Sequence, residues 1–178
     1  MRFLSFEIRN FRGVRSAKID LVPTGAGIFT LIGLNESGKT TVLEAISTFQ
    51  TRGGDEKSLY QAKPSQIDPS SFVPKHEKAT FTGDITVAAV IEFEAGEKEE
   101  CIAWAETQGA VKIDASTVPD RFTVTRGHRF ENGDKTARID SWGIGIKAKE
   151  KGSRKATALE GGSKAWQAFA AMVTVRLP

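Results

Sequence analysis

Several residue types that define common protein classes are scarce in this sequence. Cysteine occurs once, as Cys101, among 178 residues. A single cysteine excludes an internal disulfide, and such a chain fits a reducing, cytoplasmic setting. Histidine occurs only as His76 and His128, which stand far apart in the sequence. One cysteine and two isolated histidines do not supply the four ligands of a structural zinc site.

Long apolar runs are also missing. No segment approaches the run of about 20 apolar residues that a membrane-spanning helix needs. Residues 1–7 hold an acidic residue early and no small-residue cleavage site, which predicts a strand instead of a signal peptide. The hydrophobic fraction of 39% and the charged fraction of 26% are typical of a soluble globular domain with its own core.

Positive charge is concentrated in two segments. Residues 1–22 have a net charge of +3 from five basic and two acidic residues, and residues 147–164 have a net charge of +4 from six basic and two acidic residues. The whole chain has a net charge of only +3, so the rest of the chain is acidic. Basic segments can contact the phosphates of a nucleotide or of nucleic acid. A solvated surface is the alternative, and it accounts for the second segment equally well.

Residues 2–32 contain segments that predict strands, and residues that favour turns separate these segments. Residues 2–9 and 14–22 predict two strands, joined by a turn at Asn10–Gly13. Pro23–Gly27 predicts a hairpin-type connection. The short apolar run Ile28–Ile32 is typical of a buried central strand.

The segment Gly33–Thr40 matches the phosphate-binding pattern G-x-x-x-x-G-K-[ST] in full. Gly33 and Gly38 permit backbone conformations that turn successive N–H groups toward a phosphate. Lys39 is expected to reach the β- and γ-phosphates, and the Thr40 hydroxyl is expected to ligate Mg²⁺. The sequence therefore predicts a P-loop that binds a nucleoside triphosphate, most simply ATP with Mg²⁺.

The surroundings of the P-loop satisfy the structural context that the motif requires. An apolar run precedes it, and a helix is predicted after it because Val42, Ile46 and Phe49 recur at spacings of four and three. The start of that helix would add unpaired N–H groups and the positive end of its dipole to the phosphate site. The paired glycines in Arg52–Gly54 predict the end of the helix.

Residues 1–50 resemble the N-terminal part of an ABC-type ATPase head. The resemblance is to the SMC/RecF/OLD group of chromosome, repair and defence ATPases, among which the OLD-like (overcoming lysogenisation defect) proteins are most similar. It rests on Phe6–Gly13, with the sequence FEIRNFRG, and on Gly33–Ile46, with the sequence GLNESGKTTVLEAI. The resemblance implies an α/β P-loop NTPase lobe, with a mixed sheet around the P-loop helix and an antiparallel β-rich portion.

The same resemblance implies roles for individual residues. The backbone from Asn35 to Thr41 would surround the phosphates, and Arg12 would lie at the edge of the nucleotide. A surface arginine in a turn is an equally good interpretation of Arg12. The family's Q-loop glutamine could be Gln50, Gln61 or Gln66. The complete set of expected nucleotide contacts is Arg12, Gly33, Asn35, Glu36, Ser37, Gly38, Lys39, Thr40 and Thr41, with Thr40 as the metal ligand.

The remainder of the chain shows a different pattern. The nucleotide-binding core is expected over residues 1–52, followed by a long loop at 53–78 that holds one short helix. Residues 147–164 predict a flexible basic segment, and Trp166, Phe169, Ala170 and Val173 predict one face of a helix. Residues 79–146 predict an antiparallel portion with strands at 80–94, 100–105, 110–114, 121–130 and 135–142, in which Asn132-Gly133 forms a hairpin turn.

Two motifs that hydrolysis requires in this family have no match here. The Walker B segment is an apolar strand that ends in Asp-Glu, and none occurs among the 178 residues. Ala88–Glu92 comes nearest, but it lacks the aspartate and alternates as an antiparallel strand does. Leu159–Lys164 has the two glycines of the signature motif, but Glu160 stands where a serine belongs. No catalytic residue is therefore assigned.

The expected function follows from the P-loop and from the missing Walker B and signature motifs. We expect the N-terminal part of a DNA-associated ATPase, completed by a further C-terminal lobe or by a head-to-head homodimer. Any DNA contact should be electrostatic and indifferent to sequence, and no membrane contact is expected. The alternative is a module that binds ATP as a switch without hydrolysing it. A small P-loop kinase is disfavoured because two strands precede the loop and a β-rich stretch follows it.

Overall fold

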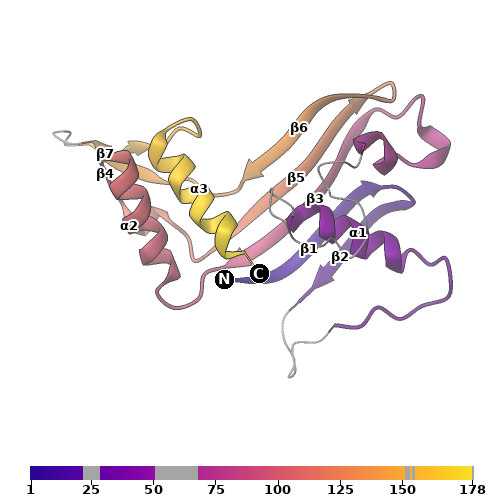
Figure 1. Cartoon of the computed structure of the whole chain (residues 1–178), viewed down its shortest axis with the longest axis horizontal. Helices are drawn as coiled ribbons and strands as arrows, with labels where there is room; N and C mark the ends of the chain where they lie inside the picture. Colours follow the sequence, from indigo (N-terminus) through magenta and orange to yellow (C-terminus); the bar gives the residue numbers. More distant parts are fainter. Residues whose placement is uncertain (22–28, 51–67, 151–152, 154, 178) are drawn as a thin grey trace. The chain divides into compact units, whose positions relative to one another are not determined.

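The computed structural model describes residues 1–21, 29–50, 68–150, 153 and 155–177 (Figure 1). Their contacts group into two compact units. The first, called the P-loop unit, comprises Leu4–Val90 and Val124–Trp142. The second, called the two-helix unit, comprises Met1–Phe3, Ile91–Thr123 and Gly143–Pro178. Each unit is described by itself.

A five-stranded sheet with the order β2-β1-β3-β5-β6 forms the framework of the P-loop unit. The β1–β2 and β5–β6 pairs are antiparallel, and the second pair agrees with the antiparallel strands predicted within residues 79–146. The alternation of apolar and polar residues buries one face of β3, so Ile85, Val87 and Ala89 enter the core. The strand bounds are Arg2–Phe11 for β1, Val14–Asp20 for β2, Gly83–Glu92 for β3, Arg121–Glu131 for β5 and Asp134–Trp142 for β6.

The hairpin between β5 and β6 confirms the turn predicted at Asn132-Gly133. Both residues adopt left-handed backbone conformations, with φ of 50° and 83°. Such angles at both central positions match the two-residue turn whose twist suits neighbouring strands. Glycine is also required at the second position, because a Cβ on Gly133 would lie 2.3 Å from the carbonyl oxygen of Lys78. Local turn chemistry therefore fixes this hairpin.

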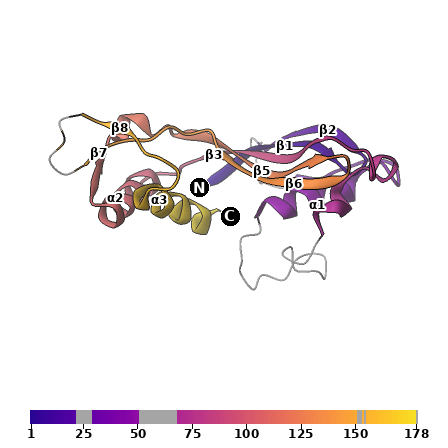
Figure 2. The ribbon, with the colours of Figure 1, turned by 90° about the horizontal axis from the view of Figure 1, so that it is seen from above.

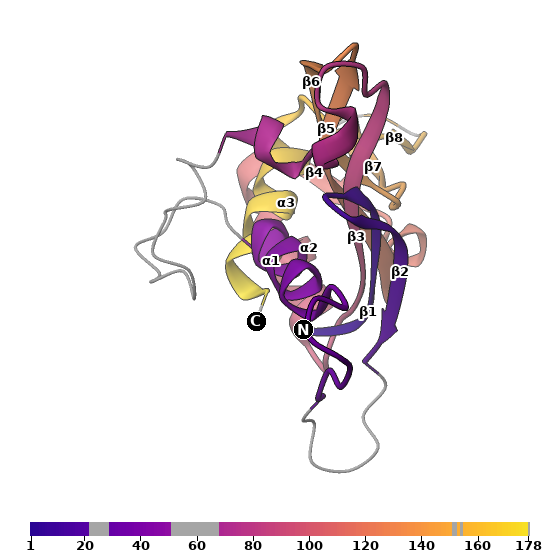
Figure 3. The same cartoon turned by 90° about the vertical axis from the view of Figure 1, so that its right-hand side faces the viewer.

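Helix α1 (Lys39–Gln50) follows the P-loop and covers one face of the five-stranded sheet (Figures 2 and 3). Ala45 and Phe49 are fully buried, and the Phe49 ring meets Phe6 of β1 edge-on at 5.7 Å. Arg126 of β5 lies over the same ring and donates a hydrogen bond of 2.5 Å from Nη1 to the Phe49 carbonyl. The predicted helix is confirmed. The buried side of the helix contains Ala45 and Phe49, whereas the Leu43 side chain is 47% exposed.

The buried central strand predicted at Ile28–Ile32 is wrong over its described part. Residues 29–34 form no strand, and Ile28 lies outside the described residues. The exposed fractions of Phe29, Ile32 and Leu34 are 46%, 92% and 85%. A continuous apolar run is buried as a strand only where neighbouring strands pair with it and other elements cover both its faces. No described strand pairs with this run, so its apolar side chains are uncovered.

Two short 3₁₀ helices occupy the end of the predicted long loop. They are η2 (Pro69–Phe72) and η3 (Lys75–Glu77), where the sequence predicted one short helix. Asp68 caps η2 by accepting the backbone N–H of Ser70, and the Phe72 ring stacks on Phe11 at 4.9 Å. This aromatic stack fixes η2 to the end of β1. Residues 51–67 and the whole connection predicted at Pro23–Gly27 lie outside the described residues.

Helices α2 (Glu97–Gly109) and α3 (Lys164–Arg176) pack against each other in the two-helix unit (Figure 1). A three-stranded sheet accompanies them, with the order β4-β7-β8. Its strands are β4 (Val111–Ile113), β7 (Lys147–Glu150) and β8 (Thr157–Ala158). The core contains an aromatic cluster and small aliphatic residues, among them Phe93, Cys101, Ala105, Phe122, Ile146, Ala148, Phe169 and Val173.

Two predictions for this unit are corrected by the structure. Residues 100–105 were predicted as a strand but belong to α2, because Cys101 and Ala105 recur one turn apart and are buried together. Residues 147–164 were predicted to be flexible, yet they contribute β7 and β8. Ile146 and Ala148 alternate with lysines, and their burial supplies the energy that orders β7. The helical face predicted around Phe169 is confirmed by α3.

Among the described helices, none is long and apolar enough to cross a membrane.

Candidate functional site

The P-loop is an exposed turn that leads directly into α1. Glu36 and Gly38 adopt left-handed conformations, with φ of 64° and 87°. The first helical bond runs from the Val42 N–H to the Gly38 carbonyl at 2.9 Å. Glycine tolerates such a φ without the steric cost that a Cβ would bring. The loop thus turns sharply and leaves the N–H groups of the first turn of α1 unpaired within the helix.

The ammonium of Lys39 lies on the loop that precedes it. Its Nζ donates to the carbonyl oxygens of Gly33 at 2.8 Å and Leu34 at 2.5 Å, and to the Ser37 hydroxyl at 3.2 Å. All three donors of the ammonium therefore point at loop oxygens. The loop is tight, because a Cβ on Gly33 would lie 2.8 Å from the Ser37 Oγ. A positive charge is held at the mouth of the turn, beside the start of a helix.

The other residues expected to contact a nucleotide lie in the same turn and in the first turn of α1. Asn35, Glu36 and Ser37 are exposed in the turn, Thr40 is exposed in the first turn of α1, and Thr41 is half-buried. Thr40 follows Lys39 directly, so its exposed hydroxyl is a candidate ligand for a divalent cation bound to a phosphate. Among the described residues there is no cluster of three or more metal-ligating His, Cys, Asp or Glu side chains.

Arg12 lies in the turn between β1 and β2 and contacts the P-loop helix. Its φ of 52° is left-handed, which is strained for an arginine. Its backbone N–H donates to the Phe72 carbonyl at 2.6 Å, and its Nε donates to the Ser71 carbonyl at 3.3 Å. The guanidinium also forms an ion pair with Glu44 of α1. Arg12 therefore joins the hairpin turn, η2 and α1.

Glu44 is a site residue that the sequence analysis missed. It lies about one helical turn after Thr40, so both residues project from the same side of α1. Its half-buried carboxylate holds Arg12 near the P-loop. The spacing of four residues from Thr40 was the available signal, but only the fold shows that Arg12 faces this position.

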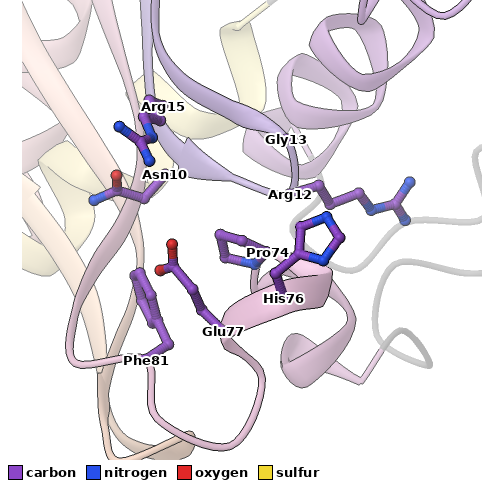
Figure 4. Close-up of a pocket in the computed structure, with 8 residues that line it drawn as sticks. All are labelled: Asn10, Arg12, Gly13, Arg15, Pro74, His76, Glu77 and Phe81. Carbon is purple, nitrogen blue, oxygen red and sulfur yellow. The ribbon is translucent and has the colours of Figure 1, made fainter.

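A pocket of about 450 Å³ lies beside the same hairpin turn (Figure 4). Figure 4 shows that the pocket is lined by Arg12 from the hairpin turn and by His76 and Glu77 of η3. Asn10, with a φ of 55°, donates from Nδ2 to the Asp84 carbonyl at 3.0 Å and so fixes one wall. Its walls present charges of both signs.

The hairpin turn is adjacent to the P-loop itself. A Cβ on Gly38 would lie 3.7 Å from the Val14 side chain, which is ordinary van der Waals contact. Val14 is the first residue of β2, directly after the turn that holds Arg12. Residues about 25 positions apart in the sequence are thereby brought together on the same unit.

Glu92 ends the segment that most resembles a Walker B strand, but its carboxylate is paired with two arginines. Glu92 accepts hydrogen bonds of 2.6 Å from Nε of Arg121 and from Nε of Arg2. The hydrogen bonds from Arg121 and Arg2 lower the pKa of this carboxyl group. The interpretation of Ala88–Glu92 as part of a half-buried strand is confirmed, since these residues lie in β3, where burial alternates.

The glycine pair resembling a signature motif precedes a helix in the two-helix unit. Ser163 is the N-cap of α3, and its hydroxyl accepts the Trp166 N–H at 3.3 Å. Gly161 and Gly162 thus lead into a capped helix start. Of the three Q-loop candidates, Gln50 is the last residue of α1, while Gln61 and Gln66 lie outside the described residues.

A comparison with known proteins identifies the family to which the chain belongs. The family model described as "AAA ATPase domain" matches residues 1–158, a range that includes the hairpin turn, the P-loop and β8. The chain belongs to the AAA ATPase domain family. A relative of this ATPase domain is the DNA replication and repair protein RecF of Erwinia tasmaniensis, which is 31% identical over 139 residues. The alignment covers 76% of this chain and 37% of that protein.

The two findings confirm the resemblance to the N-terminal part of an ABC-type head of the SMC/RecF/OLD group. They also confirm the expected fold class, an α/β P-loop NTPase lobe with an antiparallel portion. The chain spans little more than a third of the length of its RecF relative. The activity of a complete protein of this kind is therefore a matter for proposal.

Proposed function

We propose that this ATPase domain binds ATP with Mg²⁺ at Gly33–Thr40, as part of a DNA-associated ATPase. One observation carries the proposal: the Lys39 ammonium is held at the mouth of a glycine turn, next to the unpaired N–H groups at the start of α1. A helix N-terminus and an ammonium together favour the polyanionic tail of a nucleotide. The RecF relative supports the association with DNA.

Each residue around the loop has a definite role in this proposal. Lys39 neutralises the β- and γ-phosphates, and the backbone from Asn35 to Thr41 donates hydrogen bonds to them. The Thr40 hydroxyl is a ligand of Mg²⁺, which supplies charge neutralisation across the phosphates when bound. Arg12 lies at the edge of the nucleotide, where Glu44 holds its guanidinium.

A second polypeptide segment completes the site in our proposal. Phe29, Ile32 and Leu34 directly precede or begin the P-loop, and all three are exposed. Leaving such side chains in water forgoes burial worth about 1.5–3 kcal/mol for each large apolar residue. A further C-terminal lobe or a second copy of the head would cover them and supply the Walker B strand, an apolar strand ending in Asp-Glu, which has no match in this sequence. The single cysteine, Cys101, is buried and forms no disulfide within the chain, which fits a cytoplasmic location.

Calorimetry with ATP tests the nucleotide site directly. Lys39→Ala removes the cation and should abolish measurable binding, while Thr40→Ala should lower affinity only when Mg²⁺ is present. Lys18→Ala is a matched control, because Lys18 is an exposed lysine of the same unit that pairs with Asp20. Equal affinities for the wild type and Lys39→Ala would refute the assignment.

Hydrolysis by this chain alone should be very slow or absent. Without the Walker B carboxylates, neither the metal ion nor the attacking water is held in position. A phosphate-release assay measures this, and turnover on the order of 1 s⁻¹ would contradict it. The same assay addresses the second candidate function, an ATP-binding switch. If added C-terminal sequence or a second copy never restores hydrolysis, the domain is such a switch.

A further inference from the structure

Arg126 of β5 is a buried cation in the core of the P-loop unit, with an exposed fraction of 7%. Removing a charged group from water is expensive. A buried ion pair is also weak evidence for stability, because well-packed apolar side chains of similar volume often serve a core equally well. The role of this arginine therefore lies in what its guanidinium holds in place.

The guanidinium of Arg126 contacts one residue of α1 in two ways. Its central carbon lies 4.8 Å from the centre of the Phe49 ring, and its Nη1 donates to the Phe49 carbonyl at 2.5 Å. The first contact draws the cation to the face of the ring, and the second is directional. Phe6 of β1 meets the same ring edge-on. Contacts to both the ring and the carbonyl fix where this end of α1 lies and how the helix is rotated about its axis.

The carbonyl that Arg126 binds belongs to the C-terminal end of α1. Phe49 is the last residue but one of this helix, and the last four carbonyls of a helix have no partner inside it. A cation at this end is favourable, because the helix dipole places partial negative charge there. Arg126 thus holds the end of α1 that lies opposite the P-loop.

Strand β6 supplies the group that orients the guanidinium. Asp140 lies directly opposite Arg126 in the antiparallel register of β5 and β6. The Asp140 Oδ1 is 3.9 Å from the Arg126 Nε and accepts the indole N–H of Trp142 at 3.1 Å. The carboxylate compensates the buried charge, and its bond to Trp142 restricts where it can lie. A connected set of side chains therefore leads from β6 through β5 to α1.

The buried side chains of α1 lie in its second half. Within residues 39–49, only Ala45 and Phe49 are buried. The packing of the helix is thus concentrated at the end where Arg126 contacts it. The first half carries Lys39 and the unpaired N–H groups of the proposed phosphate site, and its orientation depends on how the second half is held.

The length of α1 magnifies a small error at its C-terminal end. The helix has 12 residues and rises about 1.5 Å per residue, so it is about 18 Å long. A tilt of about 5° about the C-terminal end moves Lys39 by about 1.6 Å. Binding groups are effective when they are held to within about 0.5 Å of their required places. A loose C-terminal end would therefore misplace the groups that meet the phosphates.

We infer that Arg126 is a positioning residue for the nucleotide site, acting through Phe49 and α1. It sets the place and rotation of the helix whose first turn binds the phosphates. The inference rests on the proposed binding of ATP at the P-loop. If Arg126 served only the core, neutral side chains could replace the charged pair without loss of affinity. A positioning residue cannot be replaced in this way.

A variant that removes both buried charges separates these two roles. Arg126→Met with Asp140→Asn leaves neither charge unpaired, and an asparagine oxygen can still accept the Trp142 N–H. The melting temperature should stay near that of the wild type, because replacing a buried ion pair by neutral groups is often neutral or stabilising. ATP affinity in calorimetry should fall about tenfold, the effect of losing one hydrogen bond to a charged group. Arg126→Lys keeps a cation and a donor, so it should bind ATP more tightly than the neutral variant.

A matched control removes the same two residue types from the same unit. Arg129→Met with Asp84→Asn breaks an exposed pair between β5 and β3, in which the two side chains form hydrogen bonds of 2.7 and 2.9 Å. This pair does not hold α1, so ATP affinity should be unchanged.

A second variant tests the hold on α1 without changing any charge. Phe49→Leu removes the ring that Arg126 lies over and keeps the core apolar, so it should weaken ATP binding. Phe130→Leu is its control, because Phe130 is equally buried but packs on Phe81 instead of α1. The control should lose stability and keep its ATP affinity. If the Arg126 variant does not fold, this pair of variants decides the inference.

Several results would overturn the inference. These are wild-type affinity in the neutral Arg126 variant or in Phe49→Leu, equal losses in either variant and its control, and no recovery in Arg126→Lys. Each of them would leave the proposed function intact as long as the wild type binds ATP and Lys39→Ala does not. A wild type that binds no ATP would overturn the proposed function and this inference together.

Discussion

The two units differ in where they place strained backbone. In the P-loop unit, Asn10, Arg12, Glu36 and Gly38 all adopt left-handed conformations in the hairpin turn and the loop. Among the described residues of the two-helix unit, left-handed conformations occur only at the ends of α2, at Gly96 and Ala110. Strain of about 1–3 kcal/mol per residue persists where surrounding contacts hold it, and it gathers at ligand sites.

The units also differ in what their cores contain. The two-helix unit buries an apolar cluster of Phe93, Phe122 and Phe169. The P-loop unit buries the charged side chain of Arg126 beneath α1, at an exposed fraction of 7%. Buried charge is expensive and depends on its hydrogen bonds. The comparison indicates that one unit is built for stability and the other for holding a polar site in a fixed geometry.

The largest effect should come from the core of the two-helix unit. Phe169 is fully buried, so Phe169→Ala should lower the free energy of unfolding by about 3–5 kcal/mol. Urea denaturation measures the loss. Val175→Ala on the same helix is the control, because Val175 is 82% exposed and should change stability by less than about 0.5 kcal/mol. If folded Phe169→Ala protein lost ATP affinity, the division of roles between the units would be wrong.

A smaller effect on stability, with a large effect on binding, should follow from Gly38→Ala. A Cβ at a φ of 87° costs about 1–3 kcal/mol, and the loop relaxes away from the phosphate-binding shape. We expect a modestly lower melting temperature and a loss of ATP binding in calorimetry. Gly13→Ala is the control, because no atom lies within 4 Å of its added Cβ. Unchanged binding in Gly38→Ala would show that the loop geometry is not what the nucleotide requires.

Variants of Arg12 and Glu44 test whether Arg12 contacts the nucleotide or only anchors α1. Their ion pair is partly exposed, so breaking it from either side should cost less than about 1 kcal/mol of stability. If Arg12 lies at the nucleotide, Arg12→Ala should weaken ATP binding more than Glu44→Gln does. Melting temperatures and calorimetry on both variants decide this. Equal losses of affinity would mean that the pair only positions α1.

The smallest expected effect is a pH dependence due to His128. Burial, together with Lys135 and Arg138, lowers the pKa of His128 below its ordinary value of 6.5, and its ring stacks on Phe72. The folded state therefore favours the neutral ring. Its contribution to stability is complete above about pH 6.5 and is lost as the pH falls through the folded pKa. His128→Gln should flatten the melting temperature between about pH 7 and pH 5, and an unchanged pH profile would contradict this assignment.

Much of the local structure was determined by the sequence alone. Asn132-Gly133 selects its hairpin because two adjacent residues that tolerate positive φ define the turn. Gly33–Thr40 specifies its turn and the helix that follows for the same reason, since its glycines occupy positions that a Cβ would strain. The periodicity around Phe169 likewise predicted α3. These signals act over a few residues, so no distant part of the chain can override them easily.

Only the tertiary structure decided which of these elements meet and which side chains are covered. The apolar run before the P-loop was predicted to be buried, but burial requires neighbouring strands, and the described chain provides none. The Arg12–Glu44 pair and the facing lysines of β4 and β7 join residues more than 30 positions apart. Periodicity and composition describe each segment by itself, whereas ion pairing and burial depend on which segments pack together.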